Sequence, residues 1–140
     1  MKPGNELDRL VALKVLGWKL CRTADHISPG YSYWDRGEDP GRIVYEKDTP
    51  RFSTVIRKAW DVAEYLHRRR GFWVKVLWMT ENPVTRNKGD EIRVEFESEL
   101  EDGPRGDAFG VSLPHAICLA ALEVVEQSLE ESESVETNGC

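Results

Sequence analysis

Residues 114–129 read Pro-His-Ala-Ile-Cys-Leu-Ala-Ala-Leu-Glu-Val-Val-Glu-Gln-Ser-Leu, and this stretch decides the fold that we expect. Its apolar side chains recur every three or four residues, which is typical of a helix with a buried face. Pro114 suits the first turn, and Ser112 before it is a candidate cap. The apolar stripes contain Ile117, Ala121 and Val124, extended by Cys118, Leu122, Val125 and Leu129. Together with Ala120 they cover more than half of the circumference, so we predict a well-buried helix.

Three segments before this helix have the pattern of strands. Phe72–Met79 is apolar almost throughout, with Lys75 as the exception, which predicts a central strand covered on both faces. Apolar and charged residues alternate in Glu91–Ser98, which predicts an antiparallel strand with one exposed face. Ala108–Ser112 is expected to form a short strand that leads into the helix.

Two further helices are predicted earlier in the chain. Ser53 is a candidate N-cap for the second helix, and Gly71 is placed to end it. The expected core stripe of this helix is Ile56, Ala59, Trp60, Ala63 and Leu66. The first helix is expected over Glu6–Leu16, with Asn5 as its N-cap and Asp8 as the partner in a capping box. Its expected buried stripe is Leu7, Leu10, Val11, Val15 and Trp18.

The remaining elements complete an α+β pattern. Tyr31–Asp35 and Arg42–Lys47 are expected to pair as a hairpin, because turn-forming residues lie between them. Helices and hairpins then alternate, which predicts a sandwich of three helices around a largely antiparallel sheet. We expect residues 1–130 to form one domain. Residues 131–140 are rich in Glu and Ser and are expected to be a disordered acidic tail.

Charge is distributed unevenly along the 140 residues, whose formal net charge is −6. Residues 1–89 carry +6, and residues 90–107 and 108–140 carry −6 each. The acidic second half would repel a phosphate backbone, so duplex DNA is not an expected partner. The Arg68–Arg70 triplet suits the negative end of a helix dipole. No apolar run is long enough to cross a membrane, so we expect no membrane partner.

Catalytic motifs are missing from the sequence: it has no phosphate-binding glycine loop, zinc-protease motif or serine elbow. His26, His67 and His115 are far apart, and the odd number of cysteines predicts no disulfide framework. Cys118 lies three residues after His115, but we expect its thiol to be buried rather than activated. The alternating acidic residues of 95–102 are interpreted as a solvated surface. We therefore expect a protein that is not an enzyme and has no catalytic residue, metal site or cofactor.

Aromatic and basic residues provide the one candidate ligand site. Trp34 and Trp73 are predicted to lie near Arg57, Arg68 and Lys75 and to line a groove with them. Aromatic faces with guanidinium donors suit a nucleotide or another planar anion. The alternative for each tryptophan is a place in the core.

Three blocks of the sequence resemble one known family. They are Glu6–Lys19 (Glu-Leu-Asp-Arg-Leu-Val-Ala-Leu-Lys-Val-Leu-Gly-Trp-Lys), Pro50–Val62 (Pro-Arg-Phe-Ser-Thr-Val-Ile-Arg-Lys-Ala-Trp-Asp-Val) and Leu113–Leu122 (Leu-Pro-His-Ala-Ile-Cys-Leu-Ala-Ala-Leu). In this order they resemble the phage ABA sandwich domain family, although Val55 stands where the family usually has Asp. The resemblance implies an α/β/α sandwich and a phage or prophage origin. It implies no activity.

These observations together favour a small accessory protein of phage or prophage origin that acts by binding in the host cytoplasm. Its target is expected to be a host protein or a small nucleotide signal, and binding either one would antagonise host defence. A structural or assembly protein of the virion and a small enzyme with a dispersed active site remain alternatives. A pocket with convergent Arg and Trp would favour the nucleotide, and a large exposed apolar patch would favour a protein. The sequence leaves the oligomeric state open.

Overall fold

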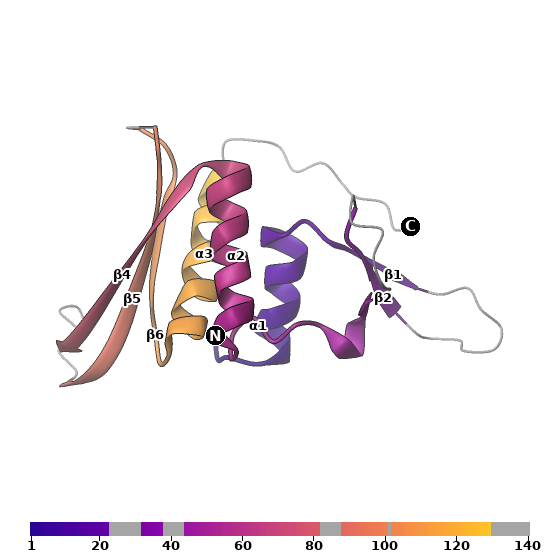
Figure 1. The fold of residues 1–140 in the computed structure, drawn as a ribbon, viewed down its shortest axis with the longest axis horizontal. Helices are drawn as coiled ribbons and strands as arrows, with labels where there is room; N and C mark the ends of the chain where they lie inside the picture. The colour runs from indigo at the N-terminus through magenta and orange to yellow at the C-terminus, as the bar shows by residue number, and fades with distance from the viewer. Residues whose placement is uncertain (23–31, 38–43, 82–87, 101, 130–140) are drawn as a thin grey trace.

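Helix α3, Leu113–Leu129, contacts both of the other helices and two strands of a sheet (Figure 1). The structure is a computed structural model that describes residues 1–22, 32–37, 44–81, 88–100 and 102–129. Ser112 caps the helix as expected, since its Oγ accepts a hydrogen bond from the His115 N–H (3.3 Å). The fully buried side chains of α3 include Ile117, Cys118, Ala121, Val124 and Val125. The prediction of a well-buried helix is therefore confirmed.

The sheet beside α3 consists of β4 (Phe72–Glu81), β5 (Lys88–Ser98) and β6 (Arg105–Gly110). All pairs are antiparallel, and the order β4-β5-β6 places β5 in the centre. The alternation predicted for β5 is confirmed, because its Val94 and Phe96 are buried on the side of the helices.

The prediction of a central, doubly covered strand at Phe72–Met79 is wrong. β4 lies at the edge of the sheet, and the side chains of Trp73 and Trp78 are 56% and 73% exposed. The sequence pattern misled because an apolar run shows which side chains avoid water, but not which faces the fold covers.

α3 lies unusually close to β6. A Cβ atom at Gly106 would be 2.7 Å from the Cα of Val124, and one at Gly110 would be 2.8 Å from the Cα of Ala116. Real Cβ atoms do not approach backbone this closely, so only glycine fits at either position. The two glycines thus set the distance between α3 and the sheet.

Helix α2, Ile56–Arg70, ends at Gly71 in the left-handed conformation (φ 70°), as predicted. Its buried side chains are Ala59, Val62, Ala63 and Leu66. Two members of the predicted core stripe are misplaced, because Ile56 is 48% exposed and Trp60 is 43% exposed. The reason is geometric: the buried face is centred between Ala59 and Leu66, and Ile56 and Trp60 lie at its margin.

Helix α1, Asn5–Leu10, continues through a π-helical turn, Val11–Val15, and Gly17 (φ 71°) follows it as predicted. Neither Asn5 nor Asp8 forms the predicted capping box, because Gly4 precedes the helix and no side chain caps it. The buried stripe is confirmed at Leu7, Val11 and Val15, with Leu10 and Trp18 packed partly buried against the core.

Asp8 instead bonds to the segment that leads into α2. Its Oδ1 accepts hydrogen bonds from the Ser53 backbone N–H (2.8 Å) and the Ser53 hydroxyl (2.6 Å). The Gly4 N–H donates to the Ser53 Oγ (2.8 Å). Ser53 is therefore not the N-cap of α2, a position that belongs to Val55. Because both Asp8 and Ser53 are buried, these bonds fasten the start of α1 to the start of α2.

A second antiparallel sheet contains β1 (Lys19–Arg22), β2 (Ser32–Asp35) and β3 (Val44–Tyr45). The predicted hairpin is confirmed by the pairing of β2 with β3, whereas β1 was not predicted. A 3-10 turn, Glu46–Asp48, follows β3.

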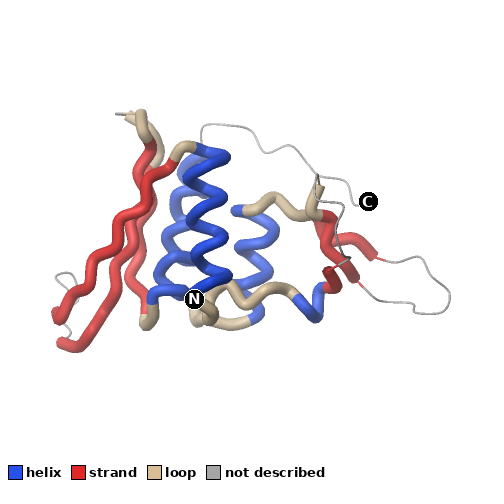
Figure 2. Tube along the Cα trace, viewed as in Figure 1, coloured by secondary structure: helices blue, strands red, loops and turns tan. Residues whose placement is uncertain are grey.

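The three helices lie between the two sheets (Figure 2). α2 and α3 cover one face of the sheet β4-β5-β6, and α1 lies between them and the second sheet. The α+β fold with three helices and antiparallel strands is confirmed. The strands divide into two sheets because α2 carries the chain from one side of the helices to the other. The expected tail, residues 131–140, lies outside the described residues.

Replacing Ser53 by Ala should lower the free energy of unfolding by about 1.5–3 kcal/mol, because the buried Asp8 carboxylate loses a hydroxyl donor. Urea denaturation measures this loss. Thr54→Ala, one residue away and exposed, is the control. Equal losses in the two variants would contradict a structural role for the Asp8–Ser53 bonds.

Replacing Gly106 by Ala should cost about 1–3 kcal/mol of stability, because the new methyl group displaces α3 from the sheet. The midpoint of urea unfolding should fall accordingly. An unchanged midpoint would show that α3 has room to move.

Candidate functional site

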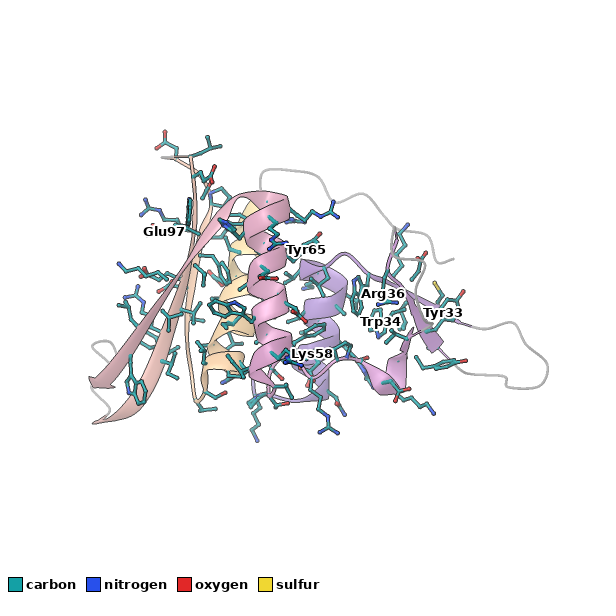
Figure 3. The ribbon with its side chains drawn as sticks, viewed as in Figure 1. Tyr33, Trp34, Arg36, Lys58, Tyr65 and Glu97 are labelled. Atoms are coloured by element: carbon teal, nitrogen blue, oxygen red, sulfur yellow. The ribbon has the colours of Figure 1, made fainter. Side chains whose placement is uncertain are left out.

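The five residues predicted to line a ligand groove do not converge on one pocket. Trp34 is buried beside Trp18, with its Nε1 donating a hydrogen bond to Thr49 Oγ1 (2.8 Å). Figure 3 shows Trp34 at β2, on the other side of the helices from the sheet β4-β5-β6. Trp34 is therefore a core residue of the second sheet, which was the alternative considered for it.

The other four residues lie on α2 and β4. Arg57 and Arg68 are exposed on one flank of α2, and they are eleven positions apart, which corresponds to about 16 Å along the helix. Lys75 and Trp73 are exposed on β4. The two arginines are too far apart to hold the same small anion.

α2 and β4 contact each other where the chain turns from one into the other. The Nδ1 of His67 lies 2.9 Å from the carbonyl oxygen of Phe72, and the rings of His67 and Trp73 are 4.8 Å apart. The imidazole Nδ1 must donate here, because its partner is a carbonyl oxygen. His67 is thus a structural link between α2 and β4.

Further along, β4 diverges from α2, as Figure 1 shows. Trp60 and Ile56 lie about two and three turns before His67, on the same flank of α2. Both are exposed, although this flank faces the sheet at His67. The helix therefore leaves apolar side chains uncovered where the strand diverges.

β4 presents matching apolar side chains. In the register, Val76 is opposite the buried Val94, and Trp78 is opposite Ile92, which packs against the core. Residues directly opposite point to the same face, so Val76 and Trp78 share the helix-facing side of the sheet. They are nevertheless 41% and 73% exposed. We call Ile56, Trp60, Val76 and Trp78 the α2–β4 apolar surface.

The two elements that carry this surface also carry basic residues. α2 contains five Arg or Lys residues against Asp61 and Glu64. Arg68 lies 3.9 Å from Glu64 as an exposed pair, which contributes little to stability. Arg57 and Lys75 form no ion pair within the described part of the chain. Arg57 on α2 and Lys75 on the other face of β4 are thus cations without an ion-pair partner among the described residues.

A small polar cavity of about 270 Å³ lies elsewhere, at β5 and β6. Its lining residues are Arg93, Glu95, Phe96, Glu97, Arg105, Gly106, Asp107 and Gln127. The guanidinium of Arg93 is already satisfied by Glu95 (2.7 Å) and Asp107 (2.8 Å). The lining has two arginines and three carboxylates, which largely offset one another as on a solvated charged face, so we do not assign a ligand to this cavity.

The remaining candidates for chemistry have structural roles. Burial raises the pKa of the Cys118 thiol far above its ordinary value, and the nearby Asp8 carboxylate raises it further. The His115 Nδ1 accepts the Val111 N–H (3.1 Å), and its Nε2 lies 2.7 Å from the Met1 carbonyl oxygen. An activated Cys–His pair needs a thiolate and a free imidazole, and this pair offers neither.

Three other observations concern metals, cysteines and membranes. Within the described ranges, no three His, Cys, Asp or Glu residues cluster as metal ligands, and His26 lies outside these ranges. Cys118 is free, but Cys21 is disulfide-bonded, so the expectation of no disulfide is wrong there. None of the described helices is both long and apolar enough to cross a membrane.

The sequence patterns of α2 and β4 predict that Trp60 and the β4 side chains lie in the core, so they do not reveal the α2–β4 apolar surface. One signal could have revealed it. The spacing of Ala59, Val62, Ala63 and Leu66 already forms a complete buried face, which leaves Trp60 outside.

Comparison with known proteins gives one match. The family model of the phage ABA sandwich domain matches residues 9–122, from α1 into α3, and so includes both sheets. No curated protein and no solved structure matches the chain.

Trp60→Ala should cost only about 1 kcal/mol of stability, because nearly half of this side chain is already in water. Leu66→Ala, which empties a fully buried site on the same helix, should cost about 2–5 kcal/mol. Urea denaturation of both variants measures the difference. Equal losses would place Trp60 in the core and remove it from the α2–β4 apolar surface.

Proposed function

This chain belongs to the phage ABA sandwich domain family, and from that premise we propose that it is an accessory protein that binds another protein through the α2–β4 apolar surface. We propose that the target is a host protein, a class that includes the proteins of host defence. Binding without chemical conversion is part of the proposal.

One observation carries the proposal: two tryptophans, Trp60 and Trp78, remain exposed on facing elements of a folded domain. Each aromatic side chain can bury about 150–250 Å² on binding. Exposed apolar patches of this kind mark protein interaction sites, and tryptophan is prominent among the residues that dominate binding energy. Ile56 and Val76 extend the patch on the same two elements.

A nucleotide is the less supported target. A nucleotide site requires cationic and aromatic side chains that converge on one pocket. In this fold Trp34 is buried at the second sheet, and Arg57 and Arg68 lie about 16 Å apart on α2. The exposed surface is instead extended and apolar, which suits a protein partner.

The absence of turnover is supported by the state of the two most reactive groups that are described. The Cys118 thiol is buried, and both ring nitrogens of His115 interact with backbone groups. Neither group is free to act as a nucleophile or a general base.

Capture from a lysate of infected host cells tests the proposal. The full chain should retain a host protein, and the double variant Trp60→Ala/Trp78→Ala should reduce this capture by about tenfold or more, as loss of two interface tryptophans does. Trp73→Ala is the matched control, because Trp73 is also exposed on β4, but its side chain points to the face opposite to that of Val76 and Trp78 and lies against His67.

Capture that the double variant does not reduce would contradict the proposed surface. Equal loss in the Trp73→Ala control would also contradict it, because binding would then not be specific to the helix-facing side. Recovery of a small nucleotide without any protein would overturn the choice of target, and recovery of a chemically altered nucleotide would overturn binding without turnover.

A further inference from the structure

The outer edge of β4 runs alongside the α2–β4 apolar surface. β4 pairs with β5 on one side, and no described strand pairs with its other side. Along this ten-residue strand, alternate backbone N–H and C=O groups therefore face outward. Natural proteins block such edges with charges, prolines or bulges. From Phe72 to Trp78 the only charged residue is Lys75, and the irregular register lies beyond, between Met79 and Glu81.

We propose that the partner adds an extended segment to this edge of β4, beneath α2, and that apolar and acidic residues alternate along the segment. The inference rests on the proposed function and specifies the occupant of the α2–β4 apolar surface. Strand addition uses the backbone groups of the free edge for affinity and alternate side chains for specificity.

The widths of the two layers leave space for one strand. Packed helices lie about 8–10 Å apart, so α2 and α3 form a layer about 20 Å wide. Three strands at about 4.8 Å spacing cover about 14 Å, and four strands cover about 19 Å. Since α3 contacts β6 and β5 while α2 contacts β4, we infer that the extra width of the helix layer lies on the α2 side, beyond β4. Trp60 and Ile56 on α2 are exposed, as an uncovered part of the helix layer requires.

A second copy of the chain does not fit these widths. Two copies joined edge to edge at β4 would form six strands, about 29 Å wide, on which four helices about 40 Å wide would have to fit. The two α2 helices would collide before the strands could pair. A single extended segment brings no helices of its own, so nothing collides with α2.

Side-chain direction and charge define the segment further. Successive side chains of a strand point to opposite faces of the sheet. On the helix-facing side, apolar residues of the segment would pack on Trp60, Val76 and Trp78. On the opposite side lies Lys75, which forms no ion pair within the described residues. Acidic residues on that side of the segment complement Lys75, which explains the alternation that we propose.

The test uses the full chain and a display library of random peptides about 12 residues long, which is enough to span β4. Selection should enrich peptides in which apolar and acidic residues alternate. A synthesised selected peptide should slow hydrogen exchange at the β4 amides between Trp73 and Trp78. Lys75→Glu should weaken its binding by about tenfold, the scale of a charge-assisted contact. Lys58→Glu is the matched control and should leave binding unchanged, because Figure 3 shows Lys58 on the side of α2 away from the sheet.

Three results would overturn strand addition. They are a selection that yields no binding peptide, selected peptides with apolar residues three and four apart, and binding without protection of the β4 amides. Any of these results overturns strand addition alone if the double variant Trp60→Ala/Trp78→Ala no longer captures the host protein, because the proposed function is then still supported. If the double variant captures the host protein as well as the unchanged chain does, the proposed function itself is wrong.

Sedimentation of the free chain distinguishes the remaining occupant. The proposal expects a monomer. A dimer that Val76→Glu breaks and that Val111→Glu preserves would overturn the single segment in favour of a second copy. Val111 is the matched control because it is 78% exposed and lies after β6.

Discussion

The close contact between α3 and β6 is the constraint on which the rest of the structure depends. At Gly106 and Gly110 the helix backbone lies where a Cβ atom would otherwise be, so α3 is held low over β6 and β5. A helix in that position cannot also cover β4. β4 is covered by α2 instead, and the two are joined at Gly71 and by the His67–Phe72 contact. The chain is thus held together at one end of β4 and leaves apolar side chains exposed toward the other.

A second constraint fixes the opposite side of the helical layer. The buried Asp8 carboxylate takes two hydrogen bonds from Ser53, which ties α1 to the segment before α2. A buried carboxylate is costly unless donors satisfy it, so this pair tolerates few other residues. Beyond it, Trp18 packs on both Trp34 and Phe52 and attaches the second sheet to α1. The fold therefore rests on one close backbone contact and one buried polar link, with tertiary packing filling the space between them.

The periodicity of the sequence was sufficient to predict the helices and strands, but not which elements pack against one another. It predicted the three helices, the β2–β3 hairpin and the alternation of β5, because each is a local pattern. It misplaced Trp60 and β4, because an apolar residue looks the same in sequence whether the fold covers it or leaves it exposed. It assigned Asp8 and Ser53 to separate helix caps, because a bond between residues 45 positions apart leaves no local pattern. Of the candidate ligand residues, local sequence could place Arg57 and Arg68 on one flank of α2, but only the tertiary structure shows how far Trp34 lies from them.

The distribution of charge gives the proposed interaction a direction. The chain is acidic overall, and residues 90–140 carry a net charge of −12. α2 opposes this with five basic residues against two acidic ones, and it borders the α2–β4 apolar surface. An acidic segment is repelled by the acidic second half of the chain and attracted by the basic residues of α2, so charge favours its approach to the β4 edge. Most of the affinity would then come from burying Trp60 and Trp78, while charge selects which segment reaches them and in which orientation. Apolar exposure and positive charge thus act at the same edge for different reasons, the first to hold the partner and the second to exclude others.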